Sequence, residues 1–459
     1  MVTDMTVGKP ARILWAFSLP ILCSSIFQQL YNMADSVIAG RFAGEDALAA
    51  VGASFPVTMI FMAVALGCSV GCSVVISQLF GGRLYREMKT AVSTSFIAII
   101  ALSVVLTAAA LIFCNPLMVL LNTPQNIFSD SALYLRIYIL GLLFLFLYNI
   151  STGVFTALGD SKTPLYLLIA SSVGNILLDL LFVAVFHMGV GGVAWATFIA
   201  QGAASILAFL VLFKRLKKME APGKGKLFSL SMLKRISVIA VPSILQQSFI
   251  SVGNLCIQGL INGYGSAVIA GYSAAVKLNT FSLTSFTALG NGLSSFAAQN
   301  IGADKPQRIK QGFRSGIIMA MCVALPFAAL FFFFGPQMAG LFMDESSVQA
   351  VSVGCRFLTI VSPFYFLIAA KLMADGVLRG AGAMLPFMVT TFSDLVLRVV
   401  LAFALNGMLG TDGIWLSWPA GWVVASVMSL IFYFTGIWKP RRSLGGDPAP
   451  VDNGGSCEW

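Results

Sequence analysis

Charged side chains are scarce in this chain of 459 residues: Asp, Glu, Lys and Arg together make up 10% of it. Ordinary soluble domains carry roughly 25% charged residues. Hydrophobic residues reach 58%, and the mean hydropathy is +0.90. So few charges could not cover the surface of a soluble protein of this length, and the sequence therefore predicts an integral membrane protein. This excludes a secreted enzyme, a nucleic-acid binder and a cytosolic multidomain protein.

Residues that carry metal or covalent chemistry are also few. The chain has one histidine, His187, and eight cysteines that show no CxxC or other metal-type spacing. Residues 159–163 contain a Lys-Thr pair but lack the glycine spacing of a phosphate-binding loop, which argues against ATP-driven transport by this chain. We therefore expect no enzymatic activity, no cofactor and no nucleic-acid partner.

Long apolar runs take up most of the remaining sequence. A helix needs about 20 apolar residues to cross a bilayer, and runs of that length recur between polar breaks rich in Gly, Pro, Asp and Ser. The sequence predicts an all-α polytopic membrane protein with twelve transmembrane helices, at residues 13–39, 47–79, 91–113, 132–158, 164–186, 190–213, 233–261, 267–299, 314–334, 350–378, 386–406 and 413–437.

The basic residues predict the orientation of these helices. If the N-terminus is cytoplasmic, most Lys and Arg side chains fall in inner loops, which matches the positive-inside rule. Both termini are then cytoplasmic. We predict an N-terminal six-helix lobe over 1–213, a basic inter-lobe linker over 214–231, a C-terminal six-helix lobe over 232–440 and a polar, disordered tail over 441–459.

Short motifs repeat between the two predicted lobes at an offset of about 221 residues. The segment QLFG at 78–81 parallels QNIG at 299–302, and FSLP at 17–20 parallels IAVP at 239–242. Since each lobe holds an even number of helices, the lobes have the same orientation and should be related by an axis along the membrane normal. Two such lobes can enclose a central cavity and give alternating access by rocking.

Seven ionisable residues lie well inside the predicted spans, where a charge is costly and by default suggests function. In the N-terminal lobe, Asp35 shares a helix face with Gln28, Tyr31 and Asn32. Asp179 lies one helical turn after Asn175. Two acids with no base nearby suggest a site for H⁺ or Na⁺, although Asp35 alone could be an acid that reaches interfacial water.

The C-terminal lobe carries a mixed set of charges. Lys371, Asp375 and Arg379 follow one another at intervals of four residues, and Asp394 precedes Arg398 by four. These spacings predict intrahelical ion pairs. The alternative is that Asp375 or Asp394 faces the substrate. Lys277 has no acid near it in sequence and could pair with either one across helices.

Several segments resemble the multidrug and toxic compound extrusion (MATE) family, in particular its prokaryotic DinF-like branch. They are QQLYNMADSVIAG at 28–40, Pro242 followed by Gln246 and Gln247, and GVFTALGDSKTP at 153–164. The resemblance extends to about residue 440. It implies a coupling site for H⁺ or Na⁺ in the N-terminal lobe and bending of the first helix at a proline, here Pro20. The matching site residues are Asp35, Asn175, Asp179 and Thr197. A second branch uses acids on helices seven and ten, but helix seven here has none.

The resemblance implies a secondary active multidrug efflux transporter that exchanges organic cations for H⁺ or Na⁺ in the inner (plasma) membrane of a bacterium or archaeon. We expect membrane lipid around it and expect it to act as a monomer. The alternative is a flippase for lipid-linked oligosaccharides, which would use Lys277, Lys371 and Arg398 as a cationic cavity. A major-facilitator carrier is a weaker alternative, because residues 81–89 lack its Asp-Arg pattern. The candidate substrate cavity comprises Gln28, Tyr31, Asn32, Gln246, Asn254, Lys277, Asp375, Asp394 and Arg398.

Overall fold

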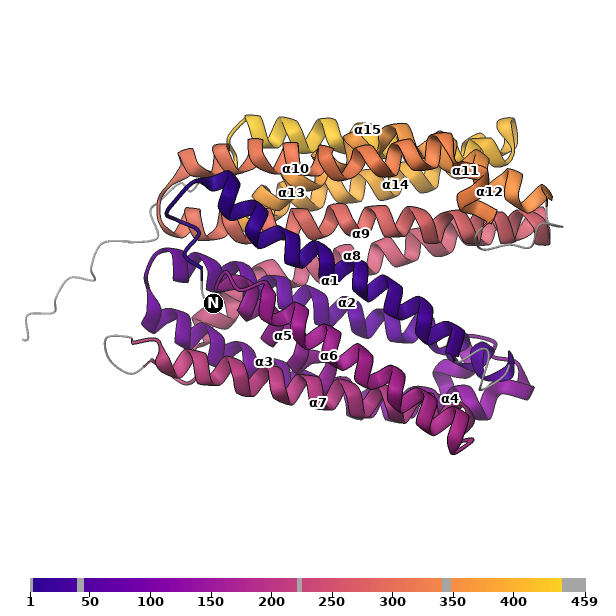
Figure 1. Ribbon diagram of the computed structural model, residues 1–459, viewed down its shortest axis with the longest axis horizontal. Helices are drawn as coiled ribbons and strands as arrows, with labels where there is room; N and C mark the ends of the chain where they lie inside the picture. The colour runs from indigo at the N-terminus through magenta and orange to yellow at the C-terminus, as the bar shows by residue number, and fades with distance from the viewer. Residues whose placement is uncertain (1–2, 39–44, 221–224, 341–347, 440–459) are drawn as a thin grey trace, which may run out of the picture.

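The computed structural model describes residues 3–38, 45–220, 225–340 and 348–439, and within these it contains helices and no strand. Figure 1 shows the helices running roughly parallel along the long axis of the molecule. The α-helices are α1 (Pro10–Ile38), α2 (Glu45–Gly81), α3 (Tyr85–Leu120), α4 (Gln125–Leu140), α5 (Leu142–Ala157), α6 (Lys162–Asp179), α7 (Gly189–Lys218), α8 (Leu230–Ile261), α9 (Ser266–Gly302), α10 (Pro306–Phe333), α11 (Gly335–Gly340), α12 (Val348–Val361), α13 (Tyr365–Gly380), α14 (Met384–Leu409) and α15 (Thr411–Phe434).

These helices account for twelve membrane crossings. Ten helical segments of the described chain are long and apolar enough to span, and α4 with α5 forms an eleventh span that bends by 47° at Gly141. The twelfth is α9, which has 37 residues but is too polar to qualify by hydropathy. Helices α12 and α13 form one span, interrupted by the short 3₁₀ turn Ser362–Phe364.

Some boundaries differ from those expected. Residues 214–218, predicted as linker, form the last turn of α7, and α8 already begins at Leu230. The predicted tail, 441–459, lies outside the described residues. The fourth predicted span starts earlier, at Gln125, because α4 is part of the same bent crossing.

The contacts between helices follow the predicted duplication. Figure 1 shows α2–α7 in one group and α9–α15 in the other, while α1 crosses obliquely between them. Helix α1 packs against α6 of its own half and against α9 and α10 of the other half. Helix α8, its counterpart, packs against α14 of its own half and against α2 and α3. Each half therefore lays its first helix against the other half, as a two-fold relation requires.

The two halves meet where α2 and α9 cross near their C-terminal ends. A Cβ atom on Gly81 would lie 1.9 Å from the carbonyl oxygen of Gln299, and one on Gly302 would lie 1.8 Å from that of Gln78. The amide of Gln78 donates to the carbonyl of Gly380 at 3.0 Å, and the amide of Gln299 donates to that of Ala157 at 2.8 Å. Each glutamine thus bonds to the opposite half, which confirms that the motifs at 78–81 and 299–302 are equivalent.

The N-terminal segment closes the end of the molecule at which α2 and α9 cross. The backbone amide of Thr3 donates to Leu158 at 3.2 Å, and that of Met5 donates to the side chain of Gln299 at 2.9 Å. The guanidinium of Arg308 donates to the carbonyls of Met5 and Gly8, at 3.1 and 2.8 Å. Residues 3–8 therefore bridge the two halves. We call this end the basic end, because it also carries the connections that hold most of the Lys and Arg side chains.

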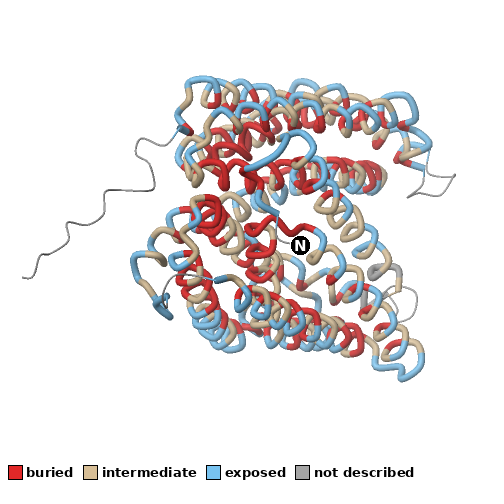
Figure 2. Tube along the Cα trace, turned by 60° about the vertical axis from the view of Figure 1, so that its left-hand side comes forward, coloured by how far each residue is buried: buried red, intermediate tan, exposed pale blue. Residues whose placement is uncertain are grey.

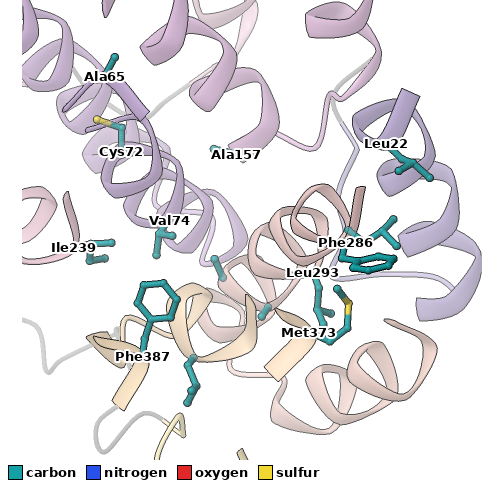
Figure 3. Packing of buried hydrophobic residues seen from close by; sticks show 14 of the residues in the cluster. Leu22, Ala65, Cys72, Val74, Ala157, Ile239, Phe286, Leu293, Met373 and Phe387 are labelled. Carbon is teal, nitrogen blue, oxygen red and sulfur yellow. The ribbon is translucent and has the colours of Figure 1, made fainter. Parts of the chain in front are cut away.

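One apolar core extends through both halves. Figure 3 shows buried side chains from α1, α2, α8, α9, α13 and α14 gathered in it, among them Leu22, Val74, Ile239, Phe286 and Phe387. Figure 2 shows buried residues concentrated where helices face one another and exposed residues along the outer faces. Many of these exposed residues are large and apolar, such as Ile112 and Phe333, as expected for a surface in contact with lipid.

Replacing Gly302 should disrupt the crossing of α2 and α9. A methyl group there would meet backbone atoms that cannot rotate away, so we expect Gly302→Ala to lower the stability by about 1–3 kcal/mol or more. Thermal unfolding and size-exclusion chromatography in detergent would measure this. Gly407→Ala is the matched control, because a Cβ atom at Gly407 meets nothing within 4 Å. Equal stability of the two variants would contradict the packing argument.

Candidate functional site

Three helices of the N-terminal half bring residues predicted from the sequence to one cavity. Gln28 and Tyr31 come from α1, Asn175 from α6 and Thr197 from α7. The cavity has a volume of about 60 Å³. Two of the four predicted coupling residues, Asn175 and Thr197, therefore share one space with two residues of the predicted substrate cavity.

Hydrogen bonds position the amide groups at this cavity. The phenol of Tyr31 donates to Oδ1 of Asn175, which links α1 to α6. Asn175 is 2% exposed, and its Nδ2 has no hydrogen-bond partner among the described residues. On α1, Nε2 of Gln28 donates to Oδ1 of Asn32 at 3.3 Å. The cavity thus has a buried amide with an unused donor beside a hydroxyl that bridges two helices.

Asp179 lies one turn beyond Asn175 and is 1% exposed. It is the last residue of α6, where the chain changes to the π-helix Leu180–Val185. Such π segments inside longer helices occur frequently at functional sites, because they shift the side chains that follow by one position. Asp35 lies in α1, but its side chain is outside the described residues. The structure therefore describes the side chains of three of the four predicted coupling residues, and two of these, Asn175 and Thr197, line the cavity.

Sequence reasoning missed several polar residues at this cavity. Ser172 lies three residues before Asn175, and Gln201 lies four residues after Thr197, so each shares a helix face with a residue that was predicted. Tyr148 of α5 also lines the cavity. Extending each predicted residue by three or four positions along its helix would have found the first two, whereas Tyr148 depends on how α5 packs.

The buried charges of the C-terminal half form a compact group. Nζ of Lys371 and Oδ2 of Asp375 are 2.9 Å apart, which confirms the predicted intrahelical ion pair. Oδ1 of Asp375 also accepts hydrogen bonds from Ser429 at 2.7 Å and from Thr390 at 3.5 Å. This carboxylate is therefore neutralised and hydrogen-bonded, although three different helices contribute to its environment.

The other two predicted ion pairs do not form. The guanidinium of Arg398 lies over the ring of Trp418, 4.3 Å from its centroid, in a cation–π contact. Oδ1 of Asp394 has no hydrogen-bond partner among the described residues. Arg379 donates to Oδ1 of Asn291 at 2.6 Å instead of to Asp375. The i,i+4 spacing permitted these pairs, but partners on other helices occupy the two arginines.

The structure separates the remaining residues of the predicted substrate cavity into two groups. Asp375, Asp394 and Arg398 are 3%, 8% and 4% exposed and lie inside the C-terminal half, packed among α13, α14 and α15, so they do not face an open cavity. The reason is that their helix faces turn toward neighbouring helices. Asn254 and Lys277 are exposed on α8 and α9, and Gln246 of α8 is half-buried.

Helix α9 carries a polar stripe that explains its low hydropathy. Ser273, Lys277, Thr280 and Thr287 are exposed at helical spacing, on the side opposite the face that packs on α12 and α13. Lipid-facing positions elsewhere are apolar, so this stripe is suited to water. On the same stripe, Thr284 accepts a hydrogen bond from Gln29 of α1 at 3.1 Å. The stripe therefore faces the N-terminal half across the space between the lobes.

A second polar cavity, of about 180 Å³, continues this stripe toward the basic end. It lies between the two halves, because α2 and α5 form one wall while α9 and α13 form the other. Its polar lining includes Ser69, Asn149, Thr152, Asn291, Ser295 and Arg379.

Removing one partner of the buried ion pair should destabilise the C-terminal half. We expect Lys371→Met to lower the stability by roughly 3–5 kcal/mol, because Asp375 would be left charged in a buried position. The double variant Lys371→Met/Asp375→Leu should recover a large part of this loss. Thermal unfolding of the protein in detergent gives both values. If the double variant loses as much stability as Lys371→Met and Asp375→Leu lose separately when added together, the two residues are not a coupled pair.

Comparisons with known proteins agree with this architecture. The family model described as MatE matches twice, at residues 20–181 and 242–404, once in each half. The probable multidrug resistance protein YoeA of Bacillus subtilis (strain 168) is 30% identical over 451 residues, which cover 95% of this chain and 96% of that protein. YpnP of the same organism, also described as a probable multidrug resistance protein, is 30% identical over 441 residues, covering 96% and 98%.

A solved structure gives the same result at the level of the fold. The crystal structure of MATE in complex with MaL6 matches with a TM-score of 0.89 and 24% identity, over 95% of this chain and 98% of that one. The twofold match of the family model reproduces the internal duplication found in the sequence and at the crossing of α2 and α9. With six spans in each half and this match, the chain belongs to the MatE family of multidrug and toxic compound extrusion transporters.

Proposed function

We propose that this protein is a secondary active exporter that exchanges organic cations, including drugs, for H⁺ or Na⁺. The observation that carries the proposal is the N-terminal cavity lined by Tyr31, Asn175 and Thr197, with the buried Asp179 one helical turn after Asn175. An ionisable residue inside a membrane protein is costly and by default suggests a functional role, such as binding or relaying an ion. The relatives named as multidrug resistance proteins support the choice of substrate class.

The chemistry of the site suits both candidate ions. Carboxylate, amide and hydroxyl oxygens from Asp179, Asn175 and Thr197 are the kind of ligands that hard cations such as Na⁺ take. A carboxylate in a place with low dielectric constant can instead take up a proton, because burial disfavours its charged form. Asp35 of α1 would complete the site, as the family resemblance implies. In either case the ion neutralises negative charge in the N-terminal lobe.

Helix α1 is the element that can transmit this change. It contacts α6, which carries Asn175, and also α9 and α10 of the other half. Pro20 lies inside its N-terminal half and has no N–H group to donate to the preceding turn, which weakens the helix at that point. The hydroxyl of Ser24 donates to the carbonyl of Pro20 at 2.9 Å. Bending of α1 near Pro20 upon ion binding would narrow the space inside the N-terminal lobe, and the substrate would be expelled from it.

The positive-inside rule makes the basic end cytoplasmic, so that both termini lie in the cytoplasm of the cell. Residues 3–8 and the crossing of α2 and α9 close this end, and the structure then corresponds to a state that is shut toward the cytoplasm. Release of the N-terminal segment and separation of the halves would open it inward. We expect the protein to act as a monomer in the plasma membrane.

The flippase alternative gains no support from the placement of its residues. It required Lys277, Lys371 and Arg398 to share a cationic cavity. Lys371 is paired with Asp375, and Arg398 lies buried over Trp418. Of the three, Lys277 alone is exposed, so they do not form a common site for a pyrophosphate group.

Removing either acid of the coupling site should stop exchange. We expect Asp179→Asn and Asp35→Asn to abolish ion-driven export of a fluorescent organic cation from proteoliposomes, because the variants can no longer change charge. Asp412→Asn is the control, since Asp412 forms an exposed ion pair with Arg356 at 2.8 Å, and it should export normally. Undiminished export by both site variants would refute the proposal.

The same vesicles distinguish the two ions. A proton gradient and a sodium gradient are imposed separately on the wild-type protein, and the gradient that drives export identifies the coupling ion. Export driven by neither gradient would overturn exchange as the mechanism, whichever residues are involved.

Tyr31→Phe tests the contribution of the hydroxyl that orients Asn175. This variant removes one hydrogen-bond donor but keeps the ring, so the cavity should retain its shape. Side chains that hydrogen-bond to an ion ligand and orient it typically contribute 10- to 100-fold to ion affinity. We therefore expect the ion concentration for half-maximal export to rise about tenfold. The measurement is export rate against ion concentration, and an unchanged value would show that Tyr31 does not position the site.

A further inference from the structure

Two apolar grooves lie on the outer surface of the protein near its basic end. The first lies between α3 and α7, which both pack against α5, and has a volume of about 520 Å³. The second lies between α10 and α15, which both pack against α13, and has a volume of about 400 Å³. Neither groove belongs to the coupling site or to the space between the lobes.

The two grooves are equivalent under the internal duplication. Positions that line the first groove recur in the second at the offset of 221 residues: Lys89 corresponds to Lys310, and Phe213 corresponds to Phe434. Further pairs at this offset are Val92 with Phe313, Ser93 with Arg314, and Leu212 with Tyr433. The two halves have kept the same kind of groove although most of the lining residues differ.

The walls of both grooves are apolar and partly aromatic. In the first, the rings of Phe96 and Phe209 meet edge to face at 5.2 Å, and Phe213 is 60% exposed. In the second, Phe313 stacks on Tyr433 at 3.8 Å, and Phe434 is 75% exposed. These walls open to the outside of the helix bundle, where lipid chains surround the protein.

Each groove has basic side chains where it reaches the basic end of the molecule. Lys89 and Lys217 line the first groove, and Lys310, Arg314 and Lys439 line the second. No acidic side chain lines either groove among the described residues. Lys217, Lys310, Arg314 and Lys439 are exposed, and none of the five forms an ion pair within the described part of the chain.

We propose that these are twin binding sites for anionic phospholipids of the membrane leaflet at the basic end. An acyl chain would lie along the aromatic wall, and the phosphate group would contact the basic residues at the end of the groove. Basic pockets between helices are suited to anionic headgroups, because each Lys or Arg near the membrane surface adds attraction. The apolar wall distinguishes this site from one for a free anion.

A lipid in the first groove would lie next to the connection between the two halves. In the first groove, Nζ of Lys89 donates to the carbonyl of Met219, and Oγ of Ser93 donates to that of Lys226 at 3.3 Å. These contacts hold the connection between α7 and α8, which joins the two halves. A phosphate group at Lys89 would therefore lie beside the chain segment that joins α7 to α8.

Native mass spectrometry of the purified full-length protein tests the proposal, with phosphatidylglycerol and phosphatidylcholine added in turn. We expect two phosphatidylglycerol molecules to bind more tightly than phosphatidylcholine. Lys89→Gln/Lys217→Gln should lose one of them, and Lys310→Gln/Arg314→Gln/Lys439→Gln should lose the other. Removing two charges should weaken binding by about 30-fold.

A control variant and a second ligand complete the test. Lys9→Gln/Lys234→Gln removes two exposed charges from the same end that line neither groove, and it should bind both lipids like the wild type. If Lys89→Gln disturbs folding through its bond to Met219, Lys217→Gln alone tests the first groove. Equal binding of the two lipids, unchanged binding in the groove variants, or full displacement by glycerol 3-phosphate alone would each overturn the proposal.

Discussion

The crossing of α2 and α9 is the contact on which the rest of the structure depends. Two glycines, Gly81 and Gly302, let the backbones approach so closely that a single added methyl group would overlap with the other helix. The amides of Gln78 and Gln299 then reach across to carbonyls of the opposite half. Because α2 and α9 are the central helices of their halves, α8 can pack on one and α1 on the other. The pseudo-symmetry of the molecule follows from this exchange of first helices.

This arrangement connects the proposed ion site to the opposite half of the protein. Helix α1 contributes Gln28 and Tyr31 to the cavity with Asn175, and on its other side it touches the polar stripe of α9 through Gln29 and Thr284. A change in the position of α1 therefore alters contacts on both sides of the space between the lobes. Helix α1 is thus an element that contacts both the cavity with Asn175 and the polar stripe of α9, as the proposed coupling requires.

The two halves treat buried charge differently, although they arose from one pattern. In the C-terminal half, Lys371 and Asp375 neutralise each other and Arg398 is covered by Trp418, so these charges contribute to structure. In the N-terminal half, Asp179 lies buried at the change from α-helix to π-helix, one helical turn after Asn175. The two halves of the duplicated fold thus differ in their buried charges. The outer grooves at Lys89 and Lys310, in contrast, both have apolar walls and basic side chains.

What the sequence determined by itself are the features that arise within one helix or from its repetition. Lipid forces each apolar run to satisfy its own backbone hydrogen bonds, so the spans can be read locally, as can the Lys371–Asp375 pair and the duplication. The exception among the spans is α9, whose exposed polar stripe faces the space between the lobes and lowers its hydropathy. Only the tertiary structure decided that Arg398 stacks on Trp418, that Arg379 turns to Asn291 and that Tyr31 bonds to Asn175. These partners lie on different helices, and which faces meet is decided by side-chain packing and close glycine contacts, not by spacing along the chain.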